Sequence, residues 1–251
     1  MNYHRIVLKK DFIIVKQLLT SHTSDSDYNL NISESSIHQR KMKNSLFLCI
    51  IGMAIVVISS NILVQFLYGK WLTYGAFTYP LAFLINDLTN RYFGSHAARQ
   101  VVLFGFVIGL ICSLIGTQIV GEFGPLVTLR IAIASGAAFL FAQLADIFVF
   151  NKIKIHPWWL KPLGSSLIGS SIDTLIFFTV AFSASLSFIE PGNDVRWANE
   201  MVPLLGLGPS LPYWMSLAVA DFSVKLSLAF FSLIPFKIIT NRFQMNLNTK
   251  R

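Results

Sequence analysis

Four carboxylates interrupt long apolar stretches of this sequence, and they are the side chains best placed to do chemistry. They are Asp87, Asp146, Asp173 and Asp221. An ionised side chain inside a membrane is costly, so a carboxylate there marks a binding site or an ion pathway unless it is neutralised. Carboxylate oxygens accept hydrogen bonds from a row of N–H donors, and aromatic rings stack on flat heterocycles. The pattern fits a pocket for a planar, nitrogen-rich small molecule.

Each carboxylate has polar neighbours three to seven residues away, at spacings that place side chains on one face of a helix. In chain order these neighbours are Asn90 and Arg91, Gln143, Ser166 and Ser170, and Lys225. An ion pair between Asp87 and Arg91 would explain both residues without any binding role. The same holds for Asp221 and Lys225. Asp173 lies deep in its apolar segment, and we predict that it faces a polar cavity.

Two further residues have a structural interpretation that the sequence favours over binding. Asp146 is four residues from Phe150 and close to a predicted cytoplasmic loop, so we expect a solvated acid at the membrane interface. Arg130 stands at the start of its apolar segment, where its aliphatic stem lets the guanidinium reach the headgroups. Arg130 nevertheless stays a candidate for substrate binding, and Asp146 stays a candidate for coupling or charge pairing.

Histidines and cysteines form no catalytic or metal-binding pattern. The five histidines are His4, His22, His38, His96 and His156, and all lie in tails or loops without an HExxH motif. Cys49 and Cys112 each stand alone in an apolar segment. We therefore predict no enzyme activity, no metal site and no cofactor, and we rank a membrane enzyme or a structural scaffold well behind a transporter.

The elements that must carry these side chains are membrane helices. The chain has 251 residues, of which 54% are hydrophobic and 13% are charged, about half the charged fraction of a soluble domain. Six apolar segments approach or exceed the roughly 20 residues that a helix needs to cross a bilayer. They are Leu46–Phe66, Leu72–Asn90, Val101–Val120, Thr128–Phe150, Leu163–Phe188 and Leu211–Phe236. The predicted fold class is all-α, a polytopic membrane protein with six transmembrane helices in the lipid bilayer.

The basic residues are distributed as a topology signal. Most of the 20 Lys and Arg residues lie before the first segment, in the second-to-third and fourth-to-fifth loops, and in the C-terminal tail. By the positive-inside rule, both termini are cytoplasmic. We predict a flexible or surface-lying cytoplasmic tail over 1–44, a transmembrane domain over 45–238 and a cytoplasmic C-terminal tail over 239–251. The net charge of +8 is not clustered on one face, so no nucleic-acid partner is expected.

Two local features bear on helix packing. Pro80 falls inside the second apolar segment and is expected to kink it. Gly105 and Gly109 form a GxxxG pattern in the third segment, which permits close helix packing. Packing within the bundle is the favoured interpretation of this pattern, and a homodimer contact is the alternative.

Four sequence blocks together resemble the signature of a known family. They are YGAFTYPLAFLINDLTNRYFG, RIAIASGAAFLFAQLADIFVFN, WWLKPLGSSLIGSSIDTLIFF and DFSVKLSLAFFSLIPF. In this order they resemble the queuosine precursor transporter family, a vitamin-uptake-transporter type, over about Trp71 to Phe236. The extended amino terminus and the long outer loop Ile189–Ser210 depart from the family's pattern without interrupting a block.

The resemblance implies a six-helix importer in the bacterial inner membrane. Its substrates would be the cyano- and aminomethyl-substituted deazaguanine bases from which queuosine in tRNA is made. The family's motif residues, carried over by position, are Asp87, Arg91, Arg130, Gln143, Asp146, Asp173, Thr174, Asp221 and Lys225. Most of these residues also stood out because they are costly in lipid.

A mechanism follows from the resemblance together with the residue chemistry. Asp173, helped by Asp87, is expected to accept hydrogen bonds from the guanine-like N–H edge, while Gln143 and Trp71 contact the ring. The predicted substrate-binding residues are Trp71, Asp87, Asn90, Arg91, Arg130, Gln143 and Asp173. The residues predicted for coupling or charge pairing are Asp146, Asp221 and Lys225. Arg91 and Lys225 would neutralise the empty carboxylates, and Asp146 or Asp221 would couple import to protons.

The alternative function is a substrate-binding subunit of an ATP-driven energy-coupling-factor importer for another heterocycle or vitamin, a fold that the family resembles. Such subunits dock on a membrane partner through small-residue faces of the first helix, and Leu46–Phe66 lacks a convincing alanine-repeat face. The chain has no Walker motif, so any use of ATP would depend on that partner. The sequence therefore favours a self-sufficient carrier.

Overall fold

The structure, a computed structural model, describes residues 42–121, 124–154 and 157–248. The chain divides into two units, Met1–Phe47 and Leu48–Arg251. Nearly all of the predicted N-terminal tail over 1–44 lies outside the described residues, so it stays a prediction. All of the predicted site residues belong to the unit Leu48–Arg251.

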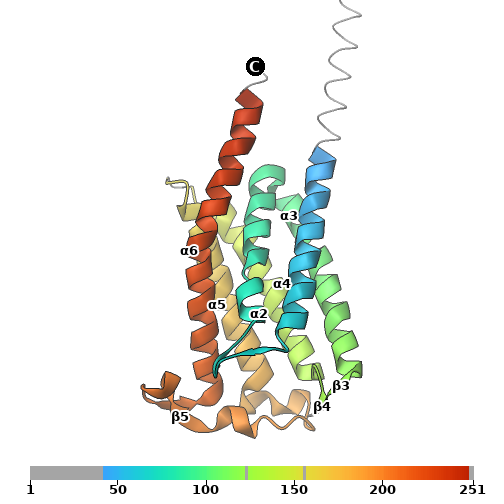
Figure 1. The fold of residues 1–251 in the computed structure, drawn as a ribbon, viewed down its shortest axis with the longest axis vertical. Coiled ribbons are helices and arrows are strands. Elements are labelled where there is room, and N and C mark those ends of the chain that lie inside the picture. Colours follow the sequence, from blue (N-terminus) through green and yellow to red (C-terminus); the bar gives the residue numbers. More distant parts are fainter. Residues whose placement is uncertain (1–41, 122–123, 155–156, 249–251) are drawn as a thin grey trace, which may run out of the picture. The chain divides into compact units, whose positions relative to one another are not determined.

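Helices long and apolar enough to cross a membrane dominate the described residues. There are five of them: Met42–Leu63, Gly75–Gln118, Leu129–Lys152, Leu160–Phe182 and Tyr213–Arg242. In Figure 1 the second comprises α2 (Gly75–Thr78) and α3 (Leu81–Gln118), followed by α4 (Leu129–Lys152), α5 (Leu160–Phe182) and α6 (Tyr213–Asn248). The prediction of an all-α polytopic membrane protein is confirmed. The predicted count of six differs from five because the second and third apolar segments fall in one continuous stretch.

That stretch is divided at Gly94. This residue has φ 81° and ψ 173°, which are not helical angles, and the positive φ is one that residues with a Cβ rarely adopt. The backbone reverses there, and Figure 1 shows α3 turning over before it descends toward β3 (Val120–Gly121). Residues 81–93 and 95–118 are therefore two helical arms joined at one glycine.

Prolines affect the helices differently. Tyr79 and Pro80 separate α2 from α3, and Pro80 is the N-cap of α3, so the predicted interruption at Pro80 is present. Proline is tolerated at a helix start because the first N–H groups have no intrahelical partner. Pro235, in contrast, lies inside α6, which continues past it although the last apolar segment was predicted to end near Phe236.

Short hairpins and 3-10 turns connect the helices. The antiparallel pairs are β1 (Leu67–Tyr68) with β2 (Leu72–Thr73), β3 (Val120–Gly121) with β4 (Gly124–Pro125), and β5 (Met201–Pro203) with β6 (Ser210–Pro212). The 3-10 turns are η1 (Ala184–Ile189), η2 (Arg196–Asn199) and η3 (Leu204–Gly206). The long loop between α5 and α6, which the sequence predicted only as a loop, contains five of these elements: η1, η2, β5, η3 and β6.

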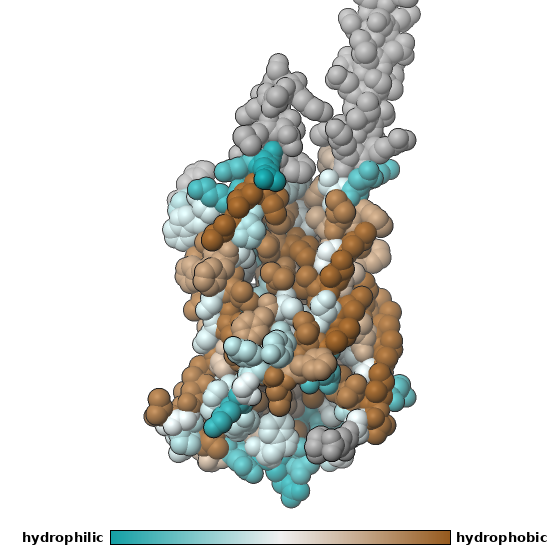
Figure 2. All heavy atoms as spheres, viewed as in Figure 1, coloured by the Kyte–Doolittle hydropathy of each residue, from teal (hydrophilic) through white to brown (hydrophobic). Residues whose placement is uncertain are grey.

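The packed interior and the outward surface follow the expected division for a membrane bundle. α4 packs most extensively against α5 and next against α3. Its contact faces are lined by small residues, among them Ala134, Ala138 and Ala142, all buried. Large apolar side chains such as Ile115, Leu175 and Phe231 are exposed, and Figure 2 shows hydrophobic residues covering much of this face. Such a surface suits lipid, because a water-soluble monomer seldom exposes so large an apolar area.

The GxxxG pattern of α3 packs within the chain. A Cβ added at Gly105 would lie 2.7 Å from Cγ of Met53 and 3.1 Å from Cζ of Phe139. A Cβ at Gly109 would lie 3.2 Å from Cγ1 of Val57. Because Met53, Val57 and Phe139 contact these glycines, the structure supports packing within the bundle, and the homodimer stays a prediction.

Gly105→Leu is expected to lower the free energy of unfolding by about 1–3 kcal/mol, because the new side chain overlaps Met53 and Phe139. Thermal unfolding of the purified protein in detergent measures this loss. The matched control is Val107→Leu, which also adds bulk to α3 but at an exposed position. Equal melting temperatures for the two variants would contradict the close packing at Gly105.

Candidate functional site

The four carboxylates converge in two clusters of buried or half-buried polar side chains. The ion-pair cluster comprises Tyr79, Asp173, Thr174, Asp221 and Lys225. The amide–carboxylate cluster comprises Asn86, Asp87, Gln143, Asp146, Ser165 and Ser166. Each cluster combines residues from at least two helices of the unit Leu48–Arg251, so each depends on the tertiary packing.

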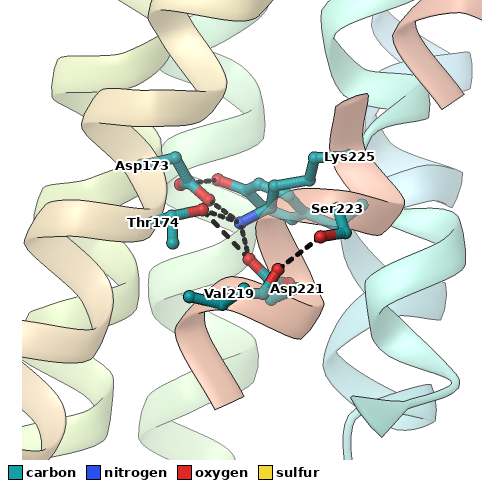
Figure 3. Close-up of polar contacts among 7 residues, drawn as sticks. Asp173, Thr174, Val219, Asp221, Ser223 and Lys225 are labelled. Atoms are coloured by element: carbon teal, nitrogen blue, oxygen red, sulfur yellow. Dashed lines mark hydrogen bonds and ion pairs between the residues drawn. The ribbon is translucent and has the colours of Figure 1, made fainter. Parts of the chain in front are cut away.

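The ion-pair cluster joins α5 to α6 through Lys225. Its ammonium group donates to Oδ2 of Asp173 at 2.5 Å and to Oγ1 of Thr174 at 3.1 Å, and it also pairs with Asp221 one turn earlier on α6. Figure 3 shows these side chains pointing toward one another from the two helices. The side chains of Lys225 and Asp173 are only 4% and 5% exposed. The predicted pair of Asp221 and Lys225 is confirmed, and Asp173 is added to it.

Both oxygens of Asp173 are already occupied. Tyr79 donates its hydroxyl to Oδ1 at 2.9 Å, while Lys225 holds Oδ2. The Lys225 ammonium also lies 5.6 Å from the centre of the Tyr79 ring, within the range of a cation–π contact. Asp221 accepts from Thr174 at 3.1 Å. In this conformation each oxygen of Asp173 already accepts one hydrogen bond, so the N–H edge of a substrate would have to share an oxygen with Tyr79 or Lys225, or displace one of them.

In the amide–carboxylate cluster, Asp87 of α3 contacts two serines of α5. Ser165 donates to Oδ1 of Asp87 at 3.1 Å, and Ser166 donates to Oδ2 at 3.3 Å. All three side chains are buried. Arg91, which the sequence offered as a partner for Asp87, is exposed, and among the described residues no ion pair joins them. Two serine hydroxyls, rather than a cation, therefore stabilise this carboxylate.

Asn86 connects the same cluster to α4. Its amide nitrogen donates to Oδ2 of Asp146 at 2.9 Å and to the backbone oxygen of Gln143 at 3.1 Å. Asn86, Gln143 and Asp146 are completely buried. The interpretation of Asp146 as a solvated acid at the interface is therefore wrong: closeness to a loop in sequence did not reveal that its helix face turns toward α3.

Asn90 lies one turn beyond Asn86 on α3. It is buried, and its side-chain oxygen accepts a hydrogen bond from the amide of Asn151 at 3.2 Å. Asn151 also donates to the backbone oxygen of Ile147 at 2.7 Å. Asn90 thus extends the polar face of α3 toward the end of α4.

Arg130 binds the end of α5. Its Nε donates to the carbonyl of Val180 at 2.6 Å, and its guanidinium also donates to the carbonyl of Ser183. Glu190 accepts from the backbone N–H of Arg130 at 2.8 Å. The last carbonyls of a helix have no intrahelical partner, and here the guanidinium supplies it. Arg130 is fully buried, so the expected snorkelling toward the headgroups is wrong.

Trp71 lies in the β1–β2 hairpin, apart from both clusters. It is half-buried, and its ring packs on Tyr213 with centroids 5.3 Å apart. Tyr213 also donates its hydroxyl to the carbonyl of Lys70 at 2.8 Å. These contacts fix the hairpin against the start of α6. The predicted contact of Trp71 with a substrate ring stays a prediction.

Sequence reasoning missed several members of the clusters. Tyr79 falls inside an apolar segment of the sequence, and the signal that could have found it is that a buried tyrosine hydroxyl needs a hydrogen-bond partner. Asn86 is adjacent to Asp87, but its contacts are to α4 and no spacing within its own helix indicates them. Ser165 has no distinctive spacing in the sequence, because serines are common in membrane helices.

A surface hollow lies over the loop between α5 and α6, away from these clusters. It is lined by Ala184, Ser187, Pro191, Gly192, Asn193, Asp194, Val195, Arg196 and Asn199. Its ion pair of Asp194 and Arg196 is exposed, and hydrogen bonds from Arg196 lower the pKa of Asp194 to about 2. An exposed pair of this kind contributes little to binding or stability. The clusters inside the bundle are the better candidates for the site.

Comparisons with known proteins cover most of the chain. A family model described as "Putative vitamin uptake transporter" matches residues 73–240. The queuosine precursor transporter of Escherichia coli (strain K12) is 33% identical over an aligned length of 209 residues, and the alignment covers 77% of this chain and 86% of that protein. The probable queuosine precursor transporter of Haemophilus influenzae is 36% identical over 138 residues, 51% of this chain and 57% of that protein. The probable queuosine precursor transporter of Bacillus subtilis (strain 168) is 28% identical over 187 residues, and the alignment covers 66% of this chain and 71% of that protein. No solved structure matches the chain significantly.

Proposed function

Because this chain belongs to the putative vitamin uptake transporter family, we propose that it imports queuosine precursors across the bacterial inner membrane. The observation that carries the proposal is the 33% identity to a queuosine precursor transporter along 86% of that protein's length. The aligned region is long enough to include most of the helical bundle. The substrates would be the cyano- and aminomethyl-substituted deazaguanine bases.

The chemistry of these bases fits the buried polar groups of the bundle. A guanine-like edge presents one carbonyl oxygen beside an N1–H and an exocyclic amine. Carboxylate and amide side chains are the protein groups that pair with such an edge. The amide–carboxylate cluster supplies them at the junction of α3, α4 and α5, where water-poor surroundings strengthen each hydrogen bond.

The proposed topology has six crossings with both termini in the cytoplasm. The two arms of α3 on either side of Gly94 would each make one crossing, which reconciles five long helices with six predicted segments. Residues 75–93, counted through α2, rise about 28 Å, close to the thickness of the hydrocarbon core. The basic residues near Gly94 and in both tails support a cytoplasmic location for those ends.

The ion-pair cluster has a separate proposed role. Lys225 compensates both Asp173 and Asp221 while the carrier is empty, because an unpaired buried charge costs several kcal/mol. Asp173 would then belong with the charge-pairing residues rather than with the residues that contact the base. Coupling of import to protons through Asp146 or Asp221 stays part of the proposal. Uptake into liposomes with and without an imposed pH gradient tests it.

The proposed function predicts rescue of queuosine formation in cells that can neither make the bases nor import them. Expression of this chain should restore queuosine in tRNA when either base is added to the medium, and an empty vector should not. Liquid chromatography with mass spectrometry of digested tRNA measures the product. If the Escherichia coli relative rescues such cells and this chain, present in the membrane, does not, the proposal fails.

Reconstitution distinguishes a carrier from a subunit of an ATP-driven importer. The purified chain in liposomes without ATP should accumulate labelled base inside the vesicles. Binding without accumulation would instead favour a substrate-binding subunit that depends on a partner.

A further inference from the structure

The amide–carboxylate cluster contains four buried polar atoms without a hydrogen-bond partner among the described residues. They are Nε2 and Oε1 of Gln143, Oδ1 of Asn86 and Oδ1 of Asp146. All three side chains are completely buried. Buried polar side-chain atoms are paired in the large majority of cases, so four orphans in one cluster require an explanation.

These atoms lie in one small region of the bundle. Asn86 donates its amide to both Asp146 and the backbone of Gln143, which places the three residues side by side across α3 and α4. The nitrogen of Asn86 and Oδ2 of Asp146 are satisfied by that contact. The remaining Asn86 and Asp146 oxygens and the whole Gln143 amide are left for another partner.

The four atoms form a definite pattern of one donor and three acceptors. A guanine-like edge offers the opposite pattern, with one carbonyl acceptor, one ring N–H and two amine N–H donors. We propose that Asn86, Gln143 and Asp146 read this edge of the substrate. The inference rests on the proposed function and names the residues that carry its specificity.

The pairing divides the edge into two parts. The Gln143 amide would form two parallel hydrogen bonds, its nitrogen donating to the base carbonyl and its oxygen accepting from N1–H. The exocyclic amine would donate one hydrogen to Asp146 and the other to Asn86. Asp87 lies beside this set and keeps its two serine partners. The buried nitrogen of Asn90, which also has no partner among the described residues, lies one turn further along α3 and is not needed for the match.

This assignment differs from the mechanism expected from sequence, in which Asp173 accepts the N–H edge. Asp173 has both oxygens occupied in this conformation, whereas Asp146 and Gln143 have atoms without partners. A base entering between α3 and α4 would satisfy those atoms without breaking the ion-pair cluster. Recognition and charge compensation are thereby assigned to different residues.

The test measures binding to the purified wild-type chain before any variant is made. The probes are the cyano-substituted deazaguanine and its analogue without the exocyclic amine. The wild-type chain is expected to bind the analogue at least about 100-fold more weakly, because Asn86 and Asp146 would then stay unpaired. Equal affinity for the two probes would overturn the assignment while leaving the proposed function intact. Binding of neither deazaguanine base, with correctly folded protein, would overturn the proposed function itself.

Variants of the chain then identify the side chains that distinguish the base from its analogue without the exocyclic amine. Gln143→Leu should weaken binding of the full base by about 10- to 100-fold, since it removes a donor and an acceptor. Asp146→Leu should bring the two probes to within a few-fold of each other, because the amine loses an acceptor. Gln118→Leu, at an exposed glutamine of α3, is the matched control and should bind as the wild type does. Size-exclusion profiles and melting temperatures confirm folding; a folded Gln143→Leu chain with unchanged affinity would refute the role of Gln143.

Discussion

Replacing Lys225 with methionine is expected to abolish uptake and to lower the free energy of unfolding by about 3–5 kcal/mol. The substitution keeps the length of the side chain but leaves Asp173 and Asp221 facing each other without a cation. The Asp173 side chain is 5% exposed and that of Asp221 is 14% exposed, so water cannot replace the lost ammonium group. Uptake of labelled base in cells and thermal unfolding in detergent measure the two losses.

Two controls separate stability from transport in this experiment. Lys237→Met removes an exposed lysine from the same helix and should change stability by no more than about 1 kcal/mol, mainly through its contact with Trp158. Combining Lys225→Met with Asp173→Asn and Asp221→Asn removes all three charges and should recover most of the stability. If the triple variant recovers its stability but still takes up no base, the charges are needed for transport itself. Wild-type stability and uptake in Lys225→Met alone would refute the role of the cluster.

Arg130→Met is the second substitution with a large expected effect. The guanidinium donates to the carbonyls of Val180 and Ser183, and methionine removes both hydrogen bonds, leaving Ser183 only its bond from the backbone N–H of Leu186. Two lost hydrogen bonds to a charged group predict a decrease of about 3–5 kcal/mol in the free energy of unfolding. The end of α5 should loosen first, which hydrogen exchange followed by mass spectrometry can detect in peptides covering residues 176–190.

The controls for Arg130 use the same chemical change elsewhere. Arg196→Met replaces a guanidinium that is 91% exposed and should leave the free energy of unfolding nearly unchanged. Arg130→Lys should recover only part of the loss, because a single ammonium lacks the planar fork that reaches two carbonyls. Uniform exchange in Arg130→Met and wild type would show that the end of α5 does not depend on this residue.

The helices were predictable from sequence because lipid leaves few alternatives for an apolar chain. Backbone groups in a bilayer must pair within the segment, so a run of about 20 apolar residues is a helix whatever surrounds it. The predicted segment Thr128–Phe150 corresponds to α4 at Leu129–Lys152, with Thr128 as its cap. The connection between α5 and α6 was not predictable in the same way. Its 3-10 turns and hairpin depend on contacts such as that of Glu190 with Arg130.

The ionisable residues that are costly to place in lipid were identified from sequence, but most of their partners were not. Spacing along a helix predicts pairs within that helix, and it succeeded for Asp221 with Lys225. It failed for Asp87 with Arg91, because Asp87 points into the bundle while Arg91 lies near the reversal at Gly94 and is exposed. The contacts of Asp87 with α5 and of Asn86 with α4 join residues more than fifty positions apart. Only the packing of the helices brings them together.

The reversal at Gly94 has a consequence for how the protein reaches its membrane. The arm over residues 81–93 is short and carries Asn86, Asp87, Asn90 and Arg91, so alone it is a poor candidate for entry into lipid. The arm over 95–118 is far more apolar from residue 101 onward. Joined at one tight bend, the two arms can partition from the translocon as a single helical hairpin. Insertion of the apolar arm then offsets the free-energy cost of inserting the polar arm into the membrane during biogenesis.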